Sequence, residues 1–304
     1  LESLVNKNNR NKPTIEEKRE DFRVTKKHKT SLAKYANYVL QKSKIPDGPI
    51  FPLLINGKSY YRSYEGRRVS EFIKINQGSF IITGNPGSGK TYFLKQYSSY
   101  MAKQLFEWTQ GSSMKGMPKI PIFIDLRDYK GKGSLAELIS NQFPDEVPIQ
   151  NLLNENRICL LLDGFNEIDE SEQRFCKKEI MTYGYRNDIV IATRFSEALD
   201  SHSKEYILEN IEPEFIIDYI QQMGIEVPEE IREDFIGIFK NPLLFYLFAS
   251  NKIVIDSQIS IDRIFESYLE NLYKECYKDF GIELDFKKIF SEFSYNRFQN
   301  GKEI

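Results

Sequence analysis

The sequence predicts an α/β fold, in which a parallel sheet is flanked by helices on both faces, followed by a small all-helical domain. Four short apolar runs, at 79–83, 120–124, 158–162 and 189–193, are continuous rather than alternating. Such runs are typical of parallel strands that are covered on both faces. A helical pattern over 90–105 separates the first two runs, and beyond about residue 202 we expect only helices.

The composition of the 304 residues excludes several classes of protein. The 42 Lys and Arg residues nearly balance the 44 Asp and Glu residues, and the formal net charge of −2 argues against binding of nucleic acid by bulk charge. No run of about eighteen apolar residues is present, so we expect no membrane span. With 40% hydrophobic residues the chain can bury a sizeable core, and its length suggests about two domains.

The cysteines and histidines narrow the chemistry further. Cys159, Cys176 and Cys276 lie far apart without a CxxC pair, which indicates neither a disulfide framework nor a zinc site, and we expect a reducing cytoplasm. The two histidines, His28 and His202, are too few for a multi-histidine metal site and argue against His-centred hydrolysis.

We expect residues 1–50 to form a linker with one helix. The first thirty residues are polar, with acidic residues among a surplus of Lys and Arg, and we interpret them as a linker or solvated helix. A tail that contacts nucleic acid or lipid is the alternative. Apolar residues at helical spacing predict a helix over 31–41. Because the sequence begins at Leu1 and stops abruptly, we expect a piece of a longer protein.

Prolines mark the helices of the predicted helical part. Pro213, Pro228 and Pro242 each open a helical pattern of apolar residues. Proline is favoured in a first turn because its missing N–H would be unpaired there. Two more amphipathic helices are predicted over 261–280 and 286–298.

The strongest local motif is GNPGSGKT at residues 84–91, which fits GxxxxGK[ST] and lies between an apolar strand and an amphipathic helix. Its glycines let backbone N–H groups turn inward, and the following helix adds partial positive charge, so the loop is suited to phosphates. Lys90 would contact the β- and γ-phosphates, and the Thr91 hydroxyl would ligate Mg²⁺. The candidate nucleotide-binding residues here are Gly84, Asn85, Pro86, Gly87, Ser88, Gly89, Lys90, Thr91 and Tyr92.

A nucleotide site also needs an acid at the end of a neighbouring strand. Asp163 ends the third apolar run, and its carboxylate should emerge at the edge of the sheet where ligands of open α/β folds bind. Glu167 offers a second carboxylate that could orient or deprotonate an attacking water, which favours hydrolysis. Arg194 follows the fourth run, and taken alone it favours a surface ion pair over a role in the site.

Taken together, the segments GNPGSGKT, IPIFIDLRDY, LLLDGFNEID, IVIATR and KNPLL resemble a NACHT domain. NACHT domains belong to the STAND class of signal-transducing P-loop NTPases, which are related to AAA+ proteins. The resemblance implies a P-loop NTPase core over 51–202, a helical lid over 203–284 and the beginning of a winged-helix domain over 285–304. It also implies that Asp163 holds the magnesium shell, that Arg194 is a sensor of the γ-phosphate and that Pro242 lies against the adenine or ribose.

The resemblance further implies a switch that binds ATP or ADP with Mg²⁺ and hydrolyses ATP slowly. Opening of the switch would drive self-association and activate an attached effector, with effector and sensor domains lying outside this sequence. Bacterial NACHT proteins commonly act in defence against phage. A composition rich in Ile, Lys, Asn, Tyr and Phe suggests an AT-rich genome, so we expect that role here.

One residue departs from the family pattern and leaves alternatives open. Many NACHT domains have an acid where this chain has Asn166, so either Glu167 carries the proton transfer or turnover is very slow. The alternatives are a motor-like AAA+ ATPase with continuous turnover, a catalytically idle binding scaffold, and a nucleic-acid-dependent ATPase that uses the basic N-terminal stretch.

Overall fold

The computed structural model describes residues 24–43, 53–56, 58–60, 69–111, 116–143, 147–194 and 204–250, together with 266, 267, 269–271 and 274. Most of the linker expected at 1–30, most of the helix expected over 261–280 and all of the helix expected over 286–298 lie outside these residues. No helix in the described ranges combines the length and apolar character needed to cross a membrane.

The described strands form one seven-stranded sheet in the order β2-β1-β7-β3-β6-β5-β4. From β7 to β4 every neighbouring pair is parallel, whereas β1 pairs antiparallel with both β2 and β7. The bounds are β1 Leu53–Ile55, β2 Lys58–Tyr60, β3 Phe80–Gly84, β4 Ile120–Asp125, β5 Ile158–Asp163, β6 Asp188–Ala192 and β7 Lys204–Leu208. The four strands predicted from apolar runs are β3, β4, β5 and β6, and the predicted parallel sheet is confirmed.

The expectation that strands stop near residue 202 is wrong, because β7 pairs along its whole length with β3. The sequence of β7, KEYIL, contains no continuous apolar run, since most of its side chains are exposed or only partly buried. A search for continuous apolar runs finds strands that are covered on both faces. It misses a strand such as β7, whose side chains are largely exposed. The sheet therefore continues past residue 202.

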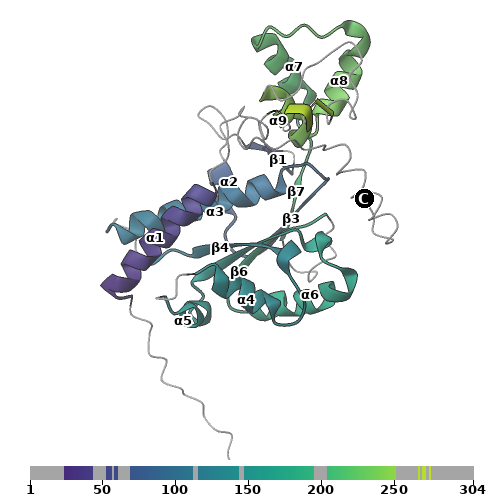
Figure 1. Cartoon of the computed structure of the whole chain (residues 1–304). Helices are drawn as coiled ribbons and strands as arrows, with labels where there is room; N and C mark the ends of the chain where they lie inside the picture. Colours follow the sequence, from purple (N-terminus) through teal and green to yellow (C-terminus); the bar gives the residue numbers. More distant parts are fainter. Residues whose placement is uncertain are drawn as a thin grey trace, which may run out of the picture.

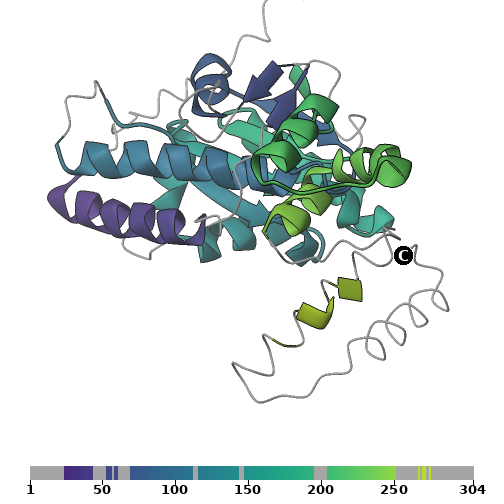
Figure 2. The same cartoon turned by 90° about the horizontal axis from the view of Figure 1, so that it is seen from above.

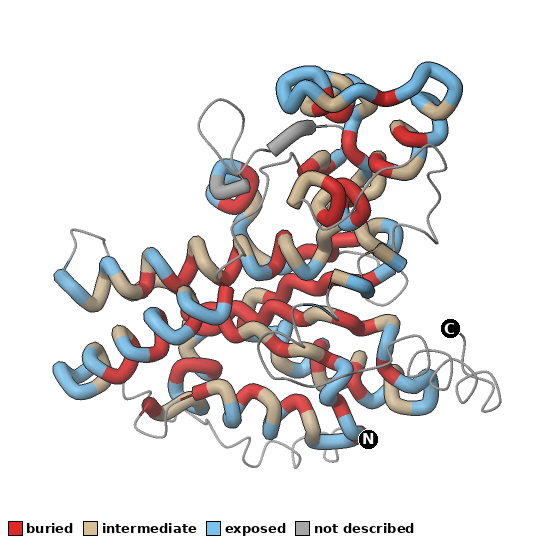
Figure 3. The backbone as a smooth tube through the Cα atoms, turned by 45° about the horizontal axis from the view of Figure 1, so that its top comes forward, coloured by how far each residue is buried: buried red, intermediate tan, exposed pale blue. Residues whose placement is uncertain are grey.

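Helices cover both faces of the sheet, as predicted (Figures 1 and 2). One face carries α1, α2 and α3, and the other carries α4, α5 and α6 (Figure 1). Cys159 and Leu161 of β5 belong to a core cluster that includes α3, whereas Ile158 and Leu160 belong to one that includes α6. Burial on both faces explains the continuous apolar runs, and Figure 3 shows the buried strands between the helices. The bounds are α1 Lys26–Lys42, α2 Val69–Ile75, α3 Lys90–Thr109, α4 Ser134–Asn141, α5 Ile149–Asn154 and α6 Glu170–Gly184.

Helix α1 begins at Lys26, five residues before the start expected from the apolar pattern. Thr25 caps it, accepting a hydrogen bond from the His28 N–H at 3.2 Å. Its apolar face packs against α3, and the buried Tyr35 hydroxyl donates to the Pro121 carbonyl of β4 at 2.7 Å. Residues 26–42 therefore form one helix packed on the body of the protein, and residues 26–30, interpreted as a linker or solvated helix, are its solvent-facing first turn.

A compact group of helices follows β7 (Figure 1), and we call its residues 213–249 the helical lid. It comprises α7 Pro213–Gln222, the 3-10 turn Glu229–Ile231, α8 Arg232–Phe239 and α9 Pro242–Ala249. Pro213 and Pro242 stand in the first turns of α7 and α9, as predicted. Pro228 precedes the 3-10 turn, and α8 begins only at Arg232. The four phenylalanines of this core, each at most 5% exposed, are Phe235, Phe239, Phe245 and Phe248.

We predict that Tyr35→Phe lowers the free energy of unfolding by about 1–2 kcal/mol, because it removes a buried hydrogen bond between α1 and β4. Denaturant unfolding measures the change. The matched control is Tyr38→Phe on the same helix, whose side chain is 43% exposed and which should change stability by less than about 0.5 kcal/mol. Equal effects of the two substitutions would contradict this account of how α1 is anchored.

Candidate functional site

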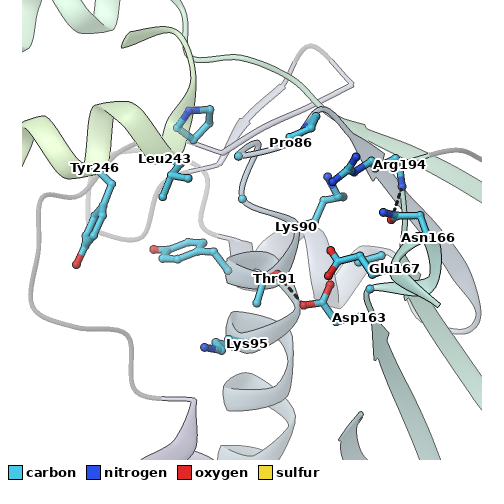
Figure 4. A pocket seen from close by; sticks show the side chains of 16 residues that line it. Pro86, Lys90, Thr91, Lys95, Asp163, Asn166, Glu167, Arg194, Leu243 and Tyr246 are labelled. Carbon is cyan, nitrogen blue, oxygen red and sulfur yellow. Dashed lines mark hydrogen bonds between the residues drawn. The ribbon is translucent and has the colours of Figure 1, made fainter. Parts of the chain in front are cut away.

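A cavity of about 490 Å³ lies where the carboxyl ends of the central strands meet helix α9 (Figure 4). This is the edge of an open α/β sheet at which ligands bind, and the volume is in the range of small-molecule sites. Its lining contains Pro86, Gly87, Gly89, Lys90, Thr91, Tyr92, Asp163, Glu167, Arg194 and Pro242, all of them predicted site residues, together with Lys95, Gly164, Asn166, Ala192, Leu243 and Tyr246.

The loop between β3 and α3 has the tight curvature that the motif predicts. Gly84 ends β3 so close to its surroundings that an added Cβ would lie 2.6 Å from Ser88 Oγ and 2.7 Å from the Leu208 carbonyl oxygen. Lys90 begins α3, and its Nζ donates to the carbonyls of Gly84 at 2.6 Å and Asn85 at 2.9 Å. Gly84, Asn85 and the buried Ser88 are thus part of the loop's frame, while the rest of the loop lines the cavity.

The hydroxyl and carboxylate expected to hold Mg²⁺ are in direct contact. Thr91 Oγ1 on α3 donates to Asp163 Oδ2 at the end of β5 at 2.6 Å (Figure 4). No cluster of three His, Cys, Asp or Glu side chains suited to a metal occurs in the described part of the chain. A hydroxyl and one carboxylate fit Mg²⁺, which usually keeps several waters and takes further oxygens from phosphates.

Two opposite charges in the lining of the cavity, those of Lys90 and Asp163, are partly buried. Burial lowers the pKa of the Lys90 ammonium, and the nearby Arg194 lowers it further. Burial also raises the pKa of the Asp163 carboxyl, an effect that the hydrogen bond from Thr91 opposes. A bound anion would stabilise the charged form of Lys90 and a bound cation that of Asp163, so the cavity suits an anion that carries its own cation.

Glu167 lies beside Asp163 and faces a second charged pair. It ends the 3-10 turn Phe165–Glu167 that follows β5. Arg127 Nε lies 3.8 Å from Glu167 Oε2 and donates to Asp125 Oδ1 at 2.8 Å. Asp125 ends β4 in register with Asp163. The sequence-based reading missed Arg127 and Asp125, although both stand in the IPIFIDLRDY segment that carried part of the resemblance.

Arg194 reaches the cavity because β6 lies directly beside β3. Its backbone N–H donates to Asn166 Oδ1 at 3.2 Å (Figure 4). Asn166 therefore connects the loop after β5 with the end of β6. The amide oxygen makes this contact without carrying a charge.

The remaining wall of the cavity comes from helix α9. Leu243 and Tyr246, three residues apart, share one helical face and lie across the cavity from Asp163 and Glu167 (Figure 4). Sequence reasoning singled out only Pro242 on this helix. Leu243 and Tyr246 could have been found from their i, i+3 spacing directly after Pro242, which places them on one face of the helix.

Residues 79–199 match the family model of the NACHT domain. Over these residues the chain is similar to a NACHT domain. The match spans the loop after β3, the end of β5 and the end of β6, so it includes three of the four elements that form the cavity. The fourth, helix α9, follows the matched NACHT residues.

Three solved structures are among those with partial similarity to this chain. AMPPCP-bound DnaA from Aquifex aeolicus is 16% identical over 69% of this chain and 77% of its own, with a TM-score of 0.34. A STAND protein with a tetratricopeptide repeat sensor from Pyrococcus horikoshii is 11% identical over 69% of this chain and 33% of its own, with a TM-score of 0.38. RuvB from Thermotoga maritima is 13% identical over 90% of this chain and 81% of its own, with a TM-score of 0.34. No curated protein matches in sequence.

We predict that Gly84→Ala destabilises the protein by about 1–3 kcal/mol, because the new Cβ would displace the backbone oxygen of Leu208 and the Ser88 side chain. Gly237→Ala is the control, since this exposed glycine of α8 has no atom within 4 Å of an added Cβ. Alanine there should stabilise by up to about 1 kcal/mol. Thermal unfolding of both variants compares them, and an unchanged Gly84→Ala would contradict the close packing of the loop.

Proposed function

We propose that this chain binds ATP or ADP with Mg²⁺ and works as a slowly hydrolysing molecular switch. One observation carries the proposal: a single cavity joins Lys90, Thr91 and Asp163 of the sheet edge to helix α9 of the helical lid. A ligand in this cavity contacts both parts of the protein. Its binding free energy can therefore depend on how the lid is placed, which is the requirement for a ligand-driven switch.

The phosphate end of the site follows from the charges and donors of the loop. Lys90 contributes a partly desolvated positive charge, and the α3 N-terminus contributes N–H groups, both suited to phosphate oxygens. Thr91 and Asp163 would hold Mg²⁺ through their oxygens. When bound, this ion supplies positive charge to the phosphate oxygens. Pro242, Leu243 and Tyr246 offer apolar surface for the rest of the nucleotide.

The chemistry proposed for this site is hydrolysis with Glu167 as the base for water and Arg194 as the sensor of the γ-phosphate. Glu167 is the acidic side chain next to Asp163 in the cavity lining. Its side chain is 44% exposed, and Arg127 Nε lies 3.8 Å from its Oε2. Asn166 in the same lining carries no charge and cannot accept a proton, which supports slow turnover. Slow turnover suits a switch, because a switch needs the bound nucleotide to change the conformation of the protein and does not need a high rate of ATP hydrolysis.

The switch requires only a modest difference between the binding free energies of the nucleotide in the two conformations of the protein. Moving a two-state equilibrium from 1:99 to 99:1 takes about 5.5 kcal/mol. We propose that ATP favours an open form that self-associates and that ADP favours a closed one. Self-association would activate an attached effector in a cytoplasmic defence against phage, with sensor and effector domains outside this chain. The match of residues 79–199 to the NACHT family model supports this part.

A catalytically idle scaffold is the second candidate function, and the Asn166 contact favours it. Asn166 holds the Arg194 backbone and supplies no carboxylate. A nucleotide would then stabilise one arrangement of the lid without being hydrolysed.

We predict that Lys90→Ala weakens ATP binding about 10- to 100-fold, the loss expected for a charge-assisted hydrogen bond. Lys103→Ala on the same helix is the control, because this exposed residue does not line the cavity and should leave the affinity unchanged. Calorimetric titration with ATP and Mg²⁺ measures both. Unimpaired binding by Lys90→Ala would show that the phosphate site has been assigned wrongly.

We predict that Glu167→Gln lowers the rate of ATP hydrolysis by about 100-fold or more while ATP still binds, since glutamine cannot accept the proton of water. Single-turnover hydrolysis and oligomeric state, measured in parallel with ATP and with ADP, separate the two candidate functions. A wild-type protein that binds ATP but does not hydrolyse it would favour the idle scaffold. Turnover by Glu167→Gln at the wild-type rate would remove Glu167 from the catalytic role.

A further inference from the structure

The first turn of α9 is bonded to the phosphate-binding loop. Asn241 Nδ2 donates to the Pro86 carbonyl at 2.9 Å, and the Leu243 N–H donates to the Gly87 carbonyl at 3.1 Å. The approach is close, since a Cβ added to Gly87 would lie 2.5 Å from Asn241 Oδ1 and 2.8 Å from its Nδ2. Two successive carbonyls of the loop are therefore held by the helical lid.

The Asn241 amide forms hydrogen bonds with α9 and with the loop at the same time. Its Oδ1 caps the helix, accepting hydrogen bonds from the N–H groups of Leu243 at 3.0 Å and Leu244 at 3.4 Å. The network fixes the orientation of the amide, because a flipped side chain would turn its NH₂ group toward two N–H donors. Serine or aspartate could cap the helix equally well. Aspartate has no donor for the Pro86 carbonyl, and the serine hydroxyl is one bond nearer the backbone than Asn241 Nδ2, so the contact with the loop requires the longer amide.

Holding the Pro86 carbonyl also fixes the N–H on the other side of the peptide bond. A trans peptide is planar, with its C=O and N–H pointing in opposite directions. The Gly87 N–H thus points away from Asn241, and Gly87 lines the cavity. In the described ranges no hydrogen bond uses this N–H, whereas the next one, of Ser88, donates to the Asn85 carbonyl at 3.1 Å.

We propose that Asn241 is a positioning residue that orients the Pro86–Gly87 peptide so that the Gly87 N–H donates to a phosphate oxygen, and that this peptide couples phosphate binding to docking of the lid. The inference rests on the function proposed above. A hydrogen bond to a peptide carbonyl makes the N–H of the same peptide a better donor. By linkage, a phosphate on the Gly87 N–H strengthens the bond between Asn241 and Pro86 by the same factor.

The first test is the ATP affinity of Asn241→Ser, which keeps an uncharged cap but removes the donor to Pro86. We expect the Kd for ATP to rise about 3- to 10-fold, as for the loss of one hydrogen bond, with little change in the melting temperature of the nucleotide-free protein. Asn241→Asp removes the same donor and adds a negative charge near the phosphates, so its defect should be larger at low salt and shrink as salt is raised. If the serine variant does not fold, the aspartate variant at high salt decides.

A control separates this role from stabilisation of the lid. Phe235→Leu alters the fully buried core of the helical lid without touching the loop. It should lower the melting temperature and leave the Kd for ATP unchanged. An ATP affinity that falls as much in Phe235→Leu as in Asn241→Ser would overturn the inference, since lid stability alone would then explain both.

The second test measures the coupling directly by hydrogen exchange of residues 241–249 with and without saturating ATP. ATP should slow exchange in the wild-type protein and slow it clearly less in Asn241→Ser. A merely structural role would shift exchange equally in both conditions. Wild-type affinity together with full protection by ATP in Asn241→Ser would overturn the inference and leave the proposed function intact. Failure of the wild-type protein to bind ATP at all would overturn both.

Discussion

The parallel pairing of β3 with both β6 and β7 is the interaction on which the rest of the site depends. Phe80 at the start of β3 is in register with Val190 on one side and Lys204 on the other. Since these strands and β5 run in one direction, their carboxyl ends open at the same edge of the sheet. The phosphate-binding loop, Asp163 and Arg194, which are far apart in the sequence, meet there because of this pairing.

The loop is constrained from the helical lid as well as from the sheet. Backbone groups of a tight loop must find partners, and here two of its carbonyls find them in the first turn of α9. The same helix presents Leu243 and Tyr246 to the cavity. One short helix therefore both bonds to the loop and lines the cavity.

The acidic side of the cavity divides its carboxylates between two partners. Asp163 is paired with the Thr91 hydroxyl, whereas Asp125, its neighbour in register, is paired with Arg127. The hydrogen bonds from Arg127 lower the pKa of the Asp125 carboxyl and keep it charged. Glu167 lies near Arg127. Burial raises the pKa of the Asp163 carboxyl, and the nearby carboxylates of Asp125 and Glu167 raise it further, so this side of the cavity favours a bound cation.

The sequence by itself determined the four doubly buried strands, the loop at 84–91 and the acids after β5, because burial on both faces and phosphate binding each impose a local pattern. It could not show β7, whose exposed side chains have no such pattern, nor the early start of α1 at Lys26. Only the tertiary structure decided that Asn241 contacts Pro86, because that bond joins residues 155 positions apart and depends on how the lid is placed.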